Sequence, residues 1–200
     1  MVSALRLRWA ARHLQRGGLV AYPTEAVYGL GCDPTQIAAI QSLLELKGRA
    51  AHKGFIVIAS RLAWLEELVI LPDDAMRQVI LSSWPGPVTW VLPARPGLPG
   101  LLTGGRPTLA VRLTAHPIAA ALSEAAGMAL VSTSANPSKR PPARNALQVR
   151  HFFFGNKQLF ILGGAVGRLS TPTQIRHGAT GAMLRPASPT STIDQEQDNR

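Results

Sequence analysis

The sequence predicts a single α/β domain in which helices flank a largely buried, twisted sheet of mixed strand direction. Short apolar runs rich in β-branched residues, such as residues 55–59, are typical of strands that are covered on both faces. These runs alternate with segments of helical periodicity, and that mixture favours an α/β fold. With 200 residues, 46% of them hydrophobic, the chain can bury one sizeable core but is short for two.

The N-terminal segment predicts an amphipathic helix, because Leu5, Trp9 and Leu14 recur at helical spacing before Gly17-Gly18 ends the pattern. Four arginines and no acid within the first 24 residues also suit an organelle transit peptide, but the helical spacing favours the first interpretation. Residues 19–22 then predict a short buried strand that ends at Pro23, and residues 34–46 predict a helix.

The remainder of the domain continues this alternation. Trp84-Pro85-Gly86-Pro87 predicts a stiff turn. We expect further strands at residues 88–92, 109–113 and 128–132, and further helices near residues 61–70, 72–83, 117–126 and 145–153.

The C-terminal residues 186–200 differ in composition from all that precedes them. They are rich in Ser, Thr, Pro, Asp, Gln and Asn and nearly lack apolar side chains. Such a segment cannot bury enough apolar surface to order itself. We therefore expect a domain over residues 1–185 followed by a disordered tail.

The chain is strongly basic, with a formal charge of +10 and a pI near 11.2. This charge predicts a positive field that attracts phosphates on a nucleotide, a nucleic acid or a membrane surface, and charge alone does not choose among them. No run of about 18 apolar residues is available to span a membrane. The single Cys32 excludes an internal disulfide, and no Cys/His spacing resembles a zinc site, so we expect a cytoplasmic protein without a metal site of its own.

The element Lys47-Gly48-Arg49, with Lys53 four residues later, gathers three cations where glycine lets the backbone bend. A guanidinium can grip phosphate oxygens in pairs, and ammonium groups act as mobile charges beside them. The alternative is a solvated basic helix end that the helix dipole favours.

Ser132-Thr133-Ser134-Ala135-Asn136 follows an apolar strand, and ligands of α/β sheets commonly bind beyond such strand ends. The alternative is an ordinary hydrogen-bonded turn, since these residues are turn formers. Serine nucleophile catalysis is a further hypothesis, but the glycine-flanked elbow of hydrolases is missing.

The stretch from Pro23 to Gly31 begins where a strand ends, and its glycines would let the backbone pass close to a ligand. Neither a phosphate-binding P-loop nor a dinucleotide fingerprint is present. Glu25 can accept a hydrogen bond from a ribose or an amine, although a solvated or salt-bridged loop acid is the commoner case.

Five ordered motifs together resemble the threonylcarbamoyl-AMP synthase family, the TsaC, YrdC and Sua type, in its short single-domain form. The resemblance runs from about residue 17 to Arg185. The motifs are Tyr22-Pro23-Thr24-Glu25 through Tyr28-Gly29-Leu30-Gly31, Lys47-Gly48-Arg49, Trp84-Pro85-Gly86-Pro87-Val88-Thr89, Ala110-Val111-Arg112, and Ser132 through Asn136. Each is modest alone, but five in the family's order and spacing are specific.

The resemblance implies a YrdC-like fold with a basic concave face, and a nucleotidyltransferase activity. L-threonine and bicarbonate would form a carbamate that attacks the α-phosphorus of ATP, giving threonylcarbamoyl-adenylate and pyrophosphate. The product would supply the threonylcarbamoyl group that downstream transfer proteins place on an adenosine beside the tRNA anticodon. Mg²⁺ would be held mainly by the phosphates, because no carboxylate cluster is evident.

The resemblance also implies roles for particular residues. Lys47 and Arg49 would be catalytic and would face the triphosphate, with Lys53 nearby. Ser134, Asn136 and Arg185 would complete the ATP site. Thr24, Ser132 and Thr173 would lie near the threonine, and the other expected pocket residues are Glu25, Tyr28 and Arg112.

Some positions depart from the family pattern. Many members have a second threonine where this chain has Ala26, and a histidine where it has Ile58. The family's C-terminal serine-threonine element best matches the stretch that begins at Pro172, with Thr173 in the place of the serine and His177 in the place of an acid. The threonine contacts inferred from these positions therefore do not transfer.

The rival from another class is an RNA-binding module that uses a basic concave face on tRNA or double-stranded RNA without turnover. Aromatic residues make up only 6% of the chain, and no stacking motif of a known RNA module is present. A family member that binds nucleotide without turnover is a third hypothesis.

Overall fold

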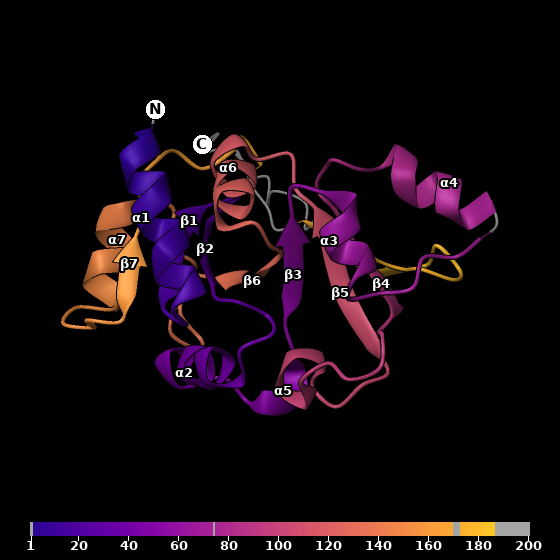
Figure 1. Cartoon of the computed structure of the whole chain (residues 1–200), viewed down its shortest axis with the longest axis horizontal. Coiled ribbons are helices and arrows are strands. Elements are labelled where there is room, and N and C mark those ends of the chain that lie inside the picture. Colours follow the sequence, from indigo (N-terminus) through magenta and orange to yellow (C-terminus); the bar gives the residue numbers. More distant parts are fainter. Residues whose placement is uncertain (1, 74, 170–172, 187–200) are drawn as a thin grey trace, which may run out of the picture.

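A computed structural model describes residues 2–73, 75–169 and 173–186, and these residues form one nine-stranded sheet flanked by helices (Figure 1). The strand order is β7-β1-β2-β6-β3-β5-β4-β8-β9. The pairs β1–β7, β3–β5 and β4–β8 are parallel and the others antiparallel, which confirms the expected mixed sheet. The strands are β1 (Leu19–Pro23), β2 (Tyr28–Gly31), β3 (Ile56–Ala59), β4 (Val88–Pro93), β5 (Thr108–Leu113), β6 (Leu130–Ser134), β7 (Leu159–Ile161), β8 (Gln174–His177) and β9 (Met183–Arg185).

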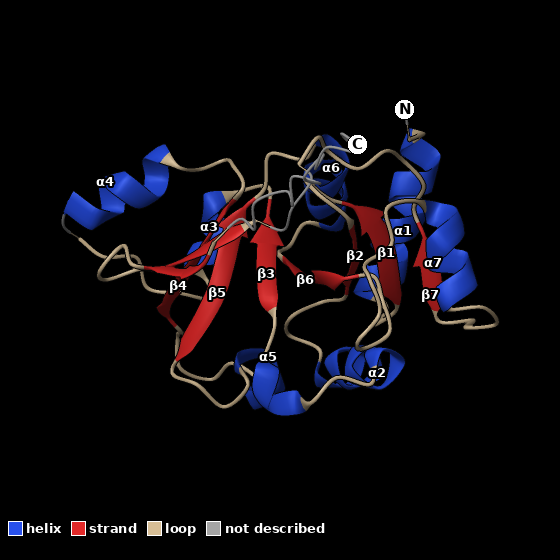
Figure 2. Ribbon diagram, turned by 180° about the vertical axis from the view of Figure 1, so that it is seen from behind, coloured by secondary structure: helices blue, strands red, loops and turns tan. Residues whose placement is uncertain are grey.

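Two helices far apart in sequence, α1 and α6, lie side by side over one face of the sheet (Figures 1 and 2). Between them and the strands lies a small core that includes Leu14, Tyr22, Ile58, Leu122 and Leu130. A larger core fills the rest of the domain. The helices are α1 (Ala4–Gln15), α2 (Ile37–Lys47), the 3-10 turn η1 (Ala51–Lys53), α3 (Leu62–Glu66), α4 (Ala75–Ser82), α5 (Gly100–Thr103), α6 (Pro117–Ala126) and α7 (Ala146–Phe152).

Most expected elements are present, with some differences. The helix expected near residues 61–70 ends at Glu66, and Val69 instead forms an antiparallel bridge with Ala94. Helix α2 begins at Ile37 rather than near Pro34, because the Asp33 carboxylate accepts hydrogen bonds from the backbone N–H and hydroxyl of Thr35 and holds a turn there. Residues 28–31, for which no element was predicted, form β2. The glycine at 31 permits close strand approach, since a Cβ there would lie 2.2 Å from the carbonyl oxygen of Val131.

The tail expected over residues 186–200 lies outside the described residues from residue 187 on. Within the described ranges, no helix has the length and apolar character needed to cross a membrane.

Candidate functional site

A cavity of about 220 Å³ lies over β3, β5 and β6, on the face of the sheet that α1 and α6 cover only in part. The sheet register explains which residues form the floor of the cavity. Ile56 lies opposite Ser132 and Ile58 opposite Arg112, so Ile56, Arg112 and Ser132 project from the same face. The cavity therefore forms where polar side chains replace apolar ones on a face that is otherwise packed under α1 and α6.

Eight of the expected site residues line this cavity, although they come from distant parts of the sequence. Four others do not line it, namely Glu25, Lys47, Lys53 and Asn136. The eight that line it are Thr24, Tyr28, Arg49, Arg112, Ser132, Ser134, Thr173 and Arg185.

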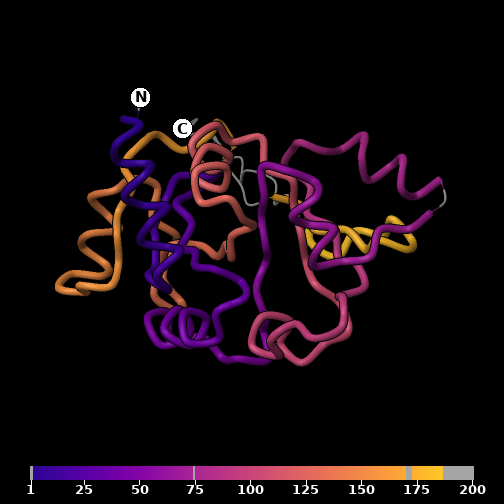
Figure 3. The backbone as a smooth tube through the Cα atoms, viewed as in Figure 1, coloured from indigo at the N-terminus to yellow at the C-terminus, as the bar shows by residue number. Residues whose placement is uncertain are grey.

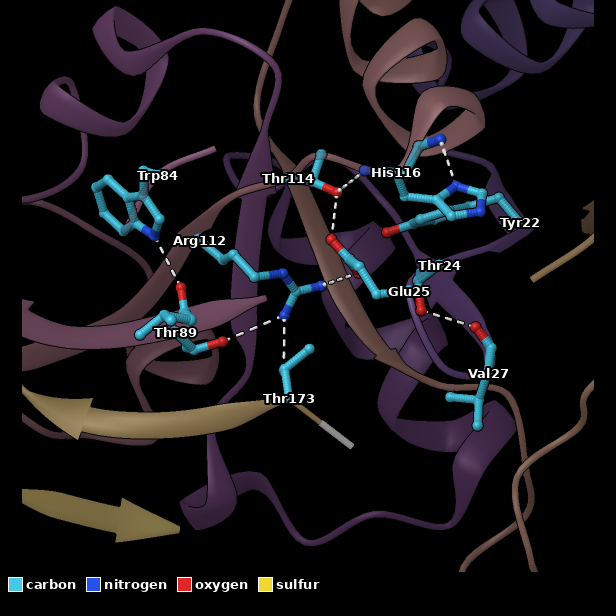
Figure 4. A network of polar contacts seen from close by, with 12 residues as sticks. Tyr22, Thr24, Glu25, Val27, Trp84, Thr89, Arg112, Thr114, His116 and Thr173 are labelled. Atoms are coloured by element: carbon cyan, nitrogen blue, oxygen red, sulfur yellow. Dashed lines mark hydrogen bonds and ion pairs between the residues drawn. The ribbon is translucent and has the colours of Figure 1, made fainter. Parts of the chain in front are cut away.

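Glu25 lies beneath the cavity and forms a buried ion pair with Arg112, at 3.0 Å between Oε2 and Nη2 (Figure 4). The other Glu25 oxygen accepts a hydrogen bond of 2.7 Å from the Thr114 hydroxyl. Arg112 also donates through Nη1 to the hydroxyls of Thr89 and Thr173. The Arg112 guanidinium is thus held from both sides, and its buried Nε finds no partner among the described residues.

The charge state of Glu25 follows from this network. Burial opposes its ionisation, but the Arg112 charge and the Thr114 hydroxyl outweigh burial and hold the pKa of the Glu25 carboxyl below its usual value. Glu25 is therefore ionised at neutral pH, as its pairing with Arg112 requires.

Arg49 reaches the cavity because α2 ends abruptly before it. Gly48 caps the helix in the left-handed region at φ 57°, and the N–H of Arg49 bonds to the Leu44 carbonyl. The Arg49 guanidinium lies over the Phe55 ring and donates to the carbonyl of Gly54 at 2.9 Å. Lys53, expected nearby, is exposed on η1 and does not line the cavity.

Lys47, expected to face the triphosphate, does not line the cavity. Its side chain is buried, and its ammonium donates to the backbone carbonyls of Ser134 and Asn136, the latter at 2.8 Å. Burial, and after it the charge of Arg49, lowers the pKa of Lys47 to about 8. Lys47 therefore supports the loop behind the cavity wall.

The same loop is fixed to the end of α2 by further hydrogen bonds. Ser138 donates through its N–H and its hydroxyl to the carbonyl of Lys47, and the hydroxyl also lies 2.8 Å from the carbonyl of Gly48. The Asn136 amide donates to the carbonyls of Pro137 and Arg140, while its buried Oδ1 has no partner in the described chain. The two motifs that sequence alone assigned separately thus form one structural unit.

The cavity carries more positive than negative charge. Arg49, Arg112 and Arg185 line it, and within the described ranges Glu25 is the only carboxylate paired with any of them. Burial, and after it repulsion from Arg112, lowers the pKa of Arg185. Such a site attracts an anion. Among the described residues no cluster of His, Cys, Asp or Glu could hold a metal ion.

Sequence reasoning missed several lining residues, including Phe55, Ile56 and Pro142, whereas Gly29 lies in a motif whose glycines it expected near a ligand. Gly29 lies between Thr24 and Ser132. A Cβ on it would lie 3.1 Å from the Thr24 methyl, so the absence of a side chain at Gly29 leaves room in the cavity. The alternation of β3 could have identified Ile56, whereas no local pattern indicates Pro142.

Comparison with known proteins identifies a family. The Sua5/YciO/YrdC family model, described as "Telomere recombination", matches residues 12–187. A protein of Alkalilimnicola ehrlichii named threonylcarbamoyl-AMP synthase is 54% identical over 182 residues, which cover 90% of this chain and 95% of that protein. A protein of the same name from Nitrosococcus oceani is 51% identical over 180 residues, covering 90% of this chain and 97% of the relative.

Solved structures agree with the fold. P. abyssi Sua5 complexed with L-threonine is 34% identical with a TM-score of 0.82, and the match covers 88% of this chain. It covers 52% of that protein, so this chain spans about half of it. E. coli YciO, at 24% identity, has a TM-score of 0.77 over 93% of this chain and 91% of its own.

Proposed function

The chain belongs to the Sua5/YciO/YrdC family, and we infer that it is a threonylcarbamoyl-AMP synthase, a nucleotidyltransferase that uses ATP. The observation that carries this inference is the gathering of three arginines and several hydroxyls in one cavity over the sheet. Their arrangement suits a substrate pair made of a polyphosphate and a small amino acid. High identity to named synthases favours this function over an RNA-binding module without turnover.

In the proposed reaction the threonine nitrogen condenses with bicarbonate to a carbamate, with loss of water. A carbamate oxygen then forms a bond to the α-phosphorus of ATP, and the bond from that phosphorus to the bridging oxygen of the β-phosphate breaks. Pyrophosphate leaves with the electron pair. Both reacting groups are anionic, so bringing them together needs cations already in place.

The cavity offers separate groups for the two substrates. Within the described ranges neither Arg49 nor Arg185 forms an ion pair with a carboxylate, so both support binding of the triphosphate. Ser134 lines the same cavity. The hydroxyls of Thr24, Ser132 and Thr173 suit the polar groups of threonine, beside the cation of Arg112. Lys47 and Asn136 would act through the loop that presents Ser134.

Mg²⁺ enters this proposal with ATP, held mainly by the phosphates. The nearest carboxylate, Glu25, is already engaged by Arg112 and Thr114 and is not free to bind a cation. The product would pass to proteins that modify tRNA, and we expect the enzyme in the cytoplasm, where its buried thiol Cys32 stays reduced.

Purified protein should release pyrophosphate from ATP only when threonine and bicarbonate are both present. The requirement follows because the carbamate is the nucleophile and neither compound alone supplies it. A coupled pyrophosphate assay with each compound omitted in turn measures this. Equal release without threonine or without bicarbonate would exclude the proposed reaction.

Activity should depend on pH near the pKa of Lys47. We expect kcat/KM for ATP to fall as pH rises through about 8, because the buried ammonium beside the triphosphate site then loses its charge.

The free energy of unfolding should instead rise over the alkaline range. The folded pKa lies below the ordinary value of 10.5, so between these limits the unfolded chain binds more protons and unfolding becomes less favourable as pH rises. Steady-state kinetics and urea unfolding over the same pH series separate the two effects.

A further inference from the structure

A second cavity, of about 930 Å³, opens where the N-terminal end of α1 meets the start of α6, and we call it the N-terminal cleft. Residues 163–168 line its third side, and they belong to the orange stretch of backbone that passes near α1 and α6 in Figure 3. Its floor is apolar, with contributions from Val2, Leu7, Ile118 and Val166. The cleft lies apart from the candidate site, although residues 163–168 contact both Tyr28 and Glu25 from behind.

Three arginines, Arg6, Arg150 and Arg168, stand around this floor, and no Asp or Glu lines it. Arg6 donates to the carbonyl of Ile161 at 2.8 Å. Arg150 and Arg168 are exposed and form neither a hydrogen bond nor an ion pair with the rest of the described chain. The cleft therefore carries positive charge that the described residues do not neutralise.

The wall of residues 163–168 also offers unused backbone donors. The N–H groups of Gly163, Gly164, Ala165 and Val166 have no acceptor within the described part of the chain. The carbonyl of Gly164, in contrast, accepts from the Tyr28 hydroxyl at 2.6 Å. Unpaired N–H groups beside an apolar floor suit a peptide, whose carbonyl oxygens can accept hydrogen bonds from them.

We propose that the N-terminal cleft binds the chain's own C-terminal segment, residues 187–200. Three of the 11 acidic residues of this basic chain lie there, at Asp194, Glu196 and Asp198. Their charge complements that of Arg6, Arg150 and Arg168, and the neighbouring Ile193 supplies an apolar side chain for the apolar floor.

The position of the acidic stretch along the segment limits how far it can reach. The described chain ends at Pro186, and Asp194 is eight residues further. At up to about 3.3 Å per residue, an extended spacer of that length reaches about 26 Å. A segment that is too polar to fold alone can still order on a surface of complementary charge.

Photocrosslinking in the full-length chain tests the proposal without relying on catalysis. With p-benzoylphenylalanine in place of Ile193, irradiation should produce intramolecular crosslinks to residues 2–7, 116–121 or 163–168, mapped by mass spectrometry. The yield should fall at least about threefold in an Arg150→Glu, Arg168→Glu double variant and at high salt, as expected for exposed ion pairs. An Arg16→Glu variant, which changes an exposed arginine outside the cleft, should crosslink normally.

Other outcomes would overturn the proposal. Crosslinks near Arg49 or Arg185 would place the segment in the candidate site instead. Crosslinked dimers would show that a second copy is the partner, and an absence of crosslinks would show that the segment does not dock. Circular dichroism of each variant establishes that the charge changes leave the fold intact.

Discussion

Replacing Glu25 with glutamine is expected to lower the free energy of unfolding by about 3–5 kcal/mol, the cost of leaving one partner of a buried ion pair uncompensated. Glu25 and Arg112 are 7% and 4% exposed, so water cannot take over the lost contact. The glutamine amide can accept from Thr114 through its oxygen, but its NH₂ group then faces the Arg112 guanidinium. Urea unfolding monitored by tryptophan fluorescence measures the change.

The exposed pair of Arg61 and Glu124 is the matched control. It joins the same residue types, but both side chains lie in solvent, with 61% and 45% of their side-chain surface exposed. A Glu124→Gln variant should therefore unfold at nearly the wild-type urea concentration. If Glu25→Gln and Glu124→Gln had equally small effects, the buried network would not have the structural role inferred from its geometry.

The acid behaviour of the same variant provides a second measurement. The pKa of Glu25 in the folded protein is held below its usual 4.5. The ionised Glu25 therefore stabilises the fold above that pH, and this stabilisation is lost as pH falls through the lower pKa of the folded state. The wild-type protein should lose stability in that acid range. The Glu25→Gln variant, already without the charge, should lose less.

The alternation of apolar runs and helical segments was enough to predict the mixed fold and most of its elements. The strands β7, β8 and β9, at or next to the sheet edges, were not predicted because none of them is fully buried, so they lack the continuous apolar run that identified β3. No strand was predicted at residues 28–31, where two of the four residues are glycine. Their role depends on a neighbouring strand, which no local pattern reveals.

Local sequence patterns were likewise not enough to predict the whole candidate site. Motif resemblance selected Arg49, Arg112, Ser132 and Arg185, and the structure brings all four to one cavity. Resemblance could not distinguish a side chain that lines the cavity from one that supports it. Glu25 and Lys47 are both charged residues within motifs, and only their tertiary partners show that they lie behind the wall.

Lys47→Met is expected to reduce kcat/KM for ATP by about 100-fold. Methionine keeps much of the volume but donates no hydrogen bond, so the carbonyls of Ser134 and Asn136 lose their shared partner. Each lost bond of this kind is worth about 1–1.5 kcal/mol, close to a factor of ten in rate, if the loop must hold Ser134 in place during turnover. Steady-state kinetics with ATP varied at saturating threonine measure the loss.

The same substitution at exposed Lys157, which lines neither the candidate site nor the N-terminal cleft, should leave the kinetics unchanged. The pH series then identifies how Lys47 acts. If its ammonium is the group that titrates near 8, the alkaline fall in kcat/KM should disappear in Lys47→Met. A variant with wild-type kinetics, or one that keeps the alkaline fall, would contradict the role of Lys47 as the cation that holds this loop against the nucleotide site.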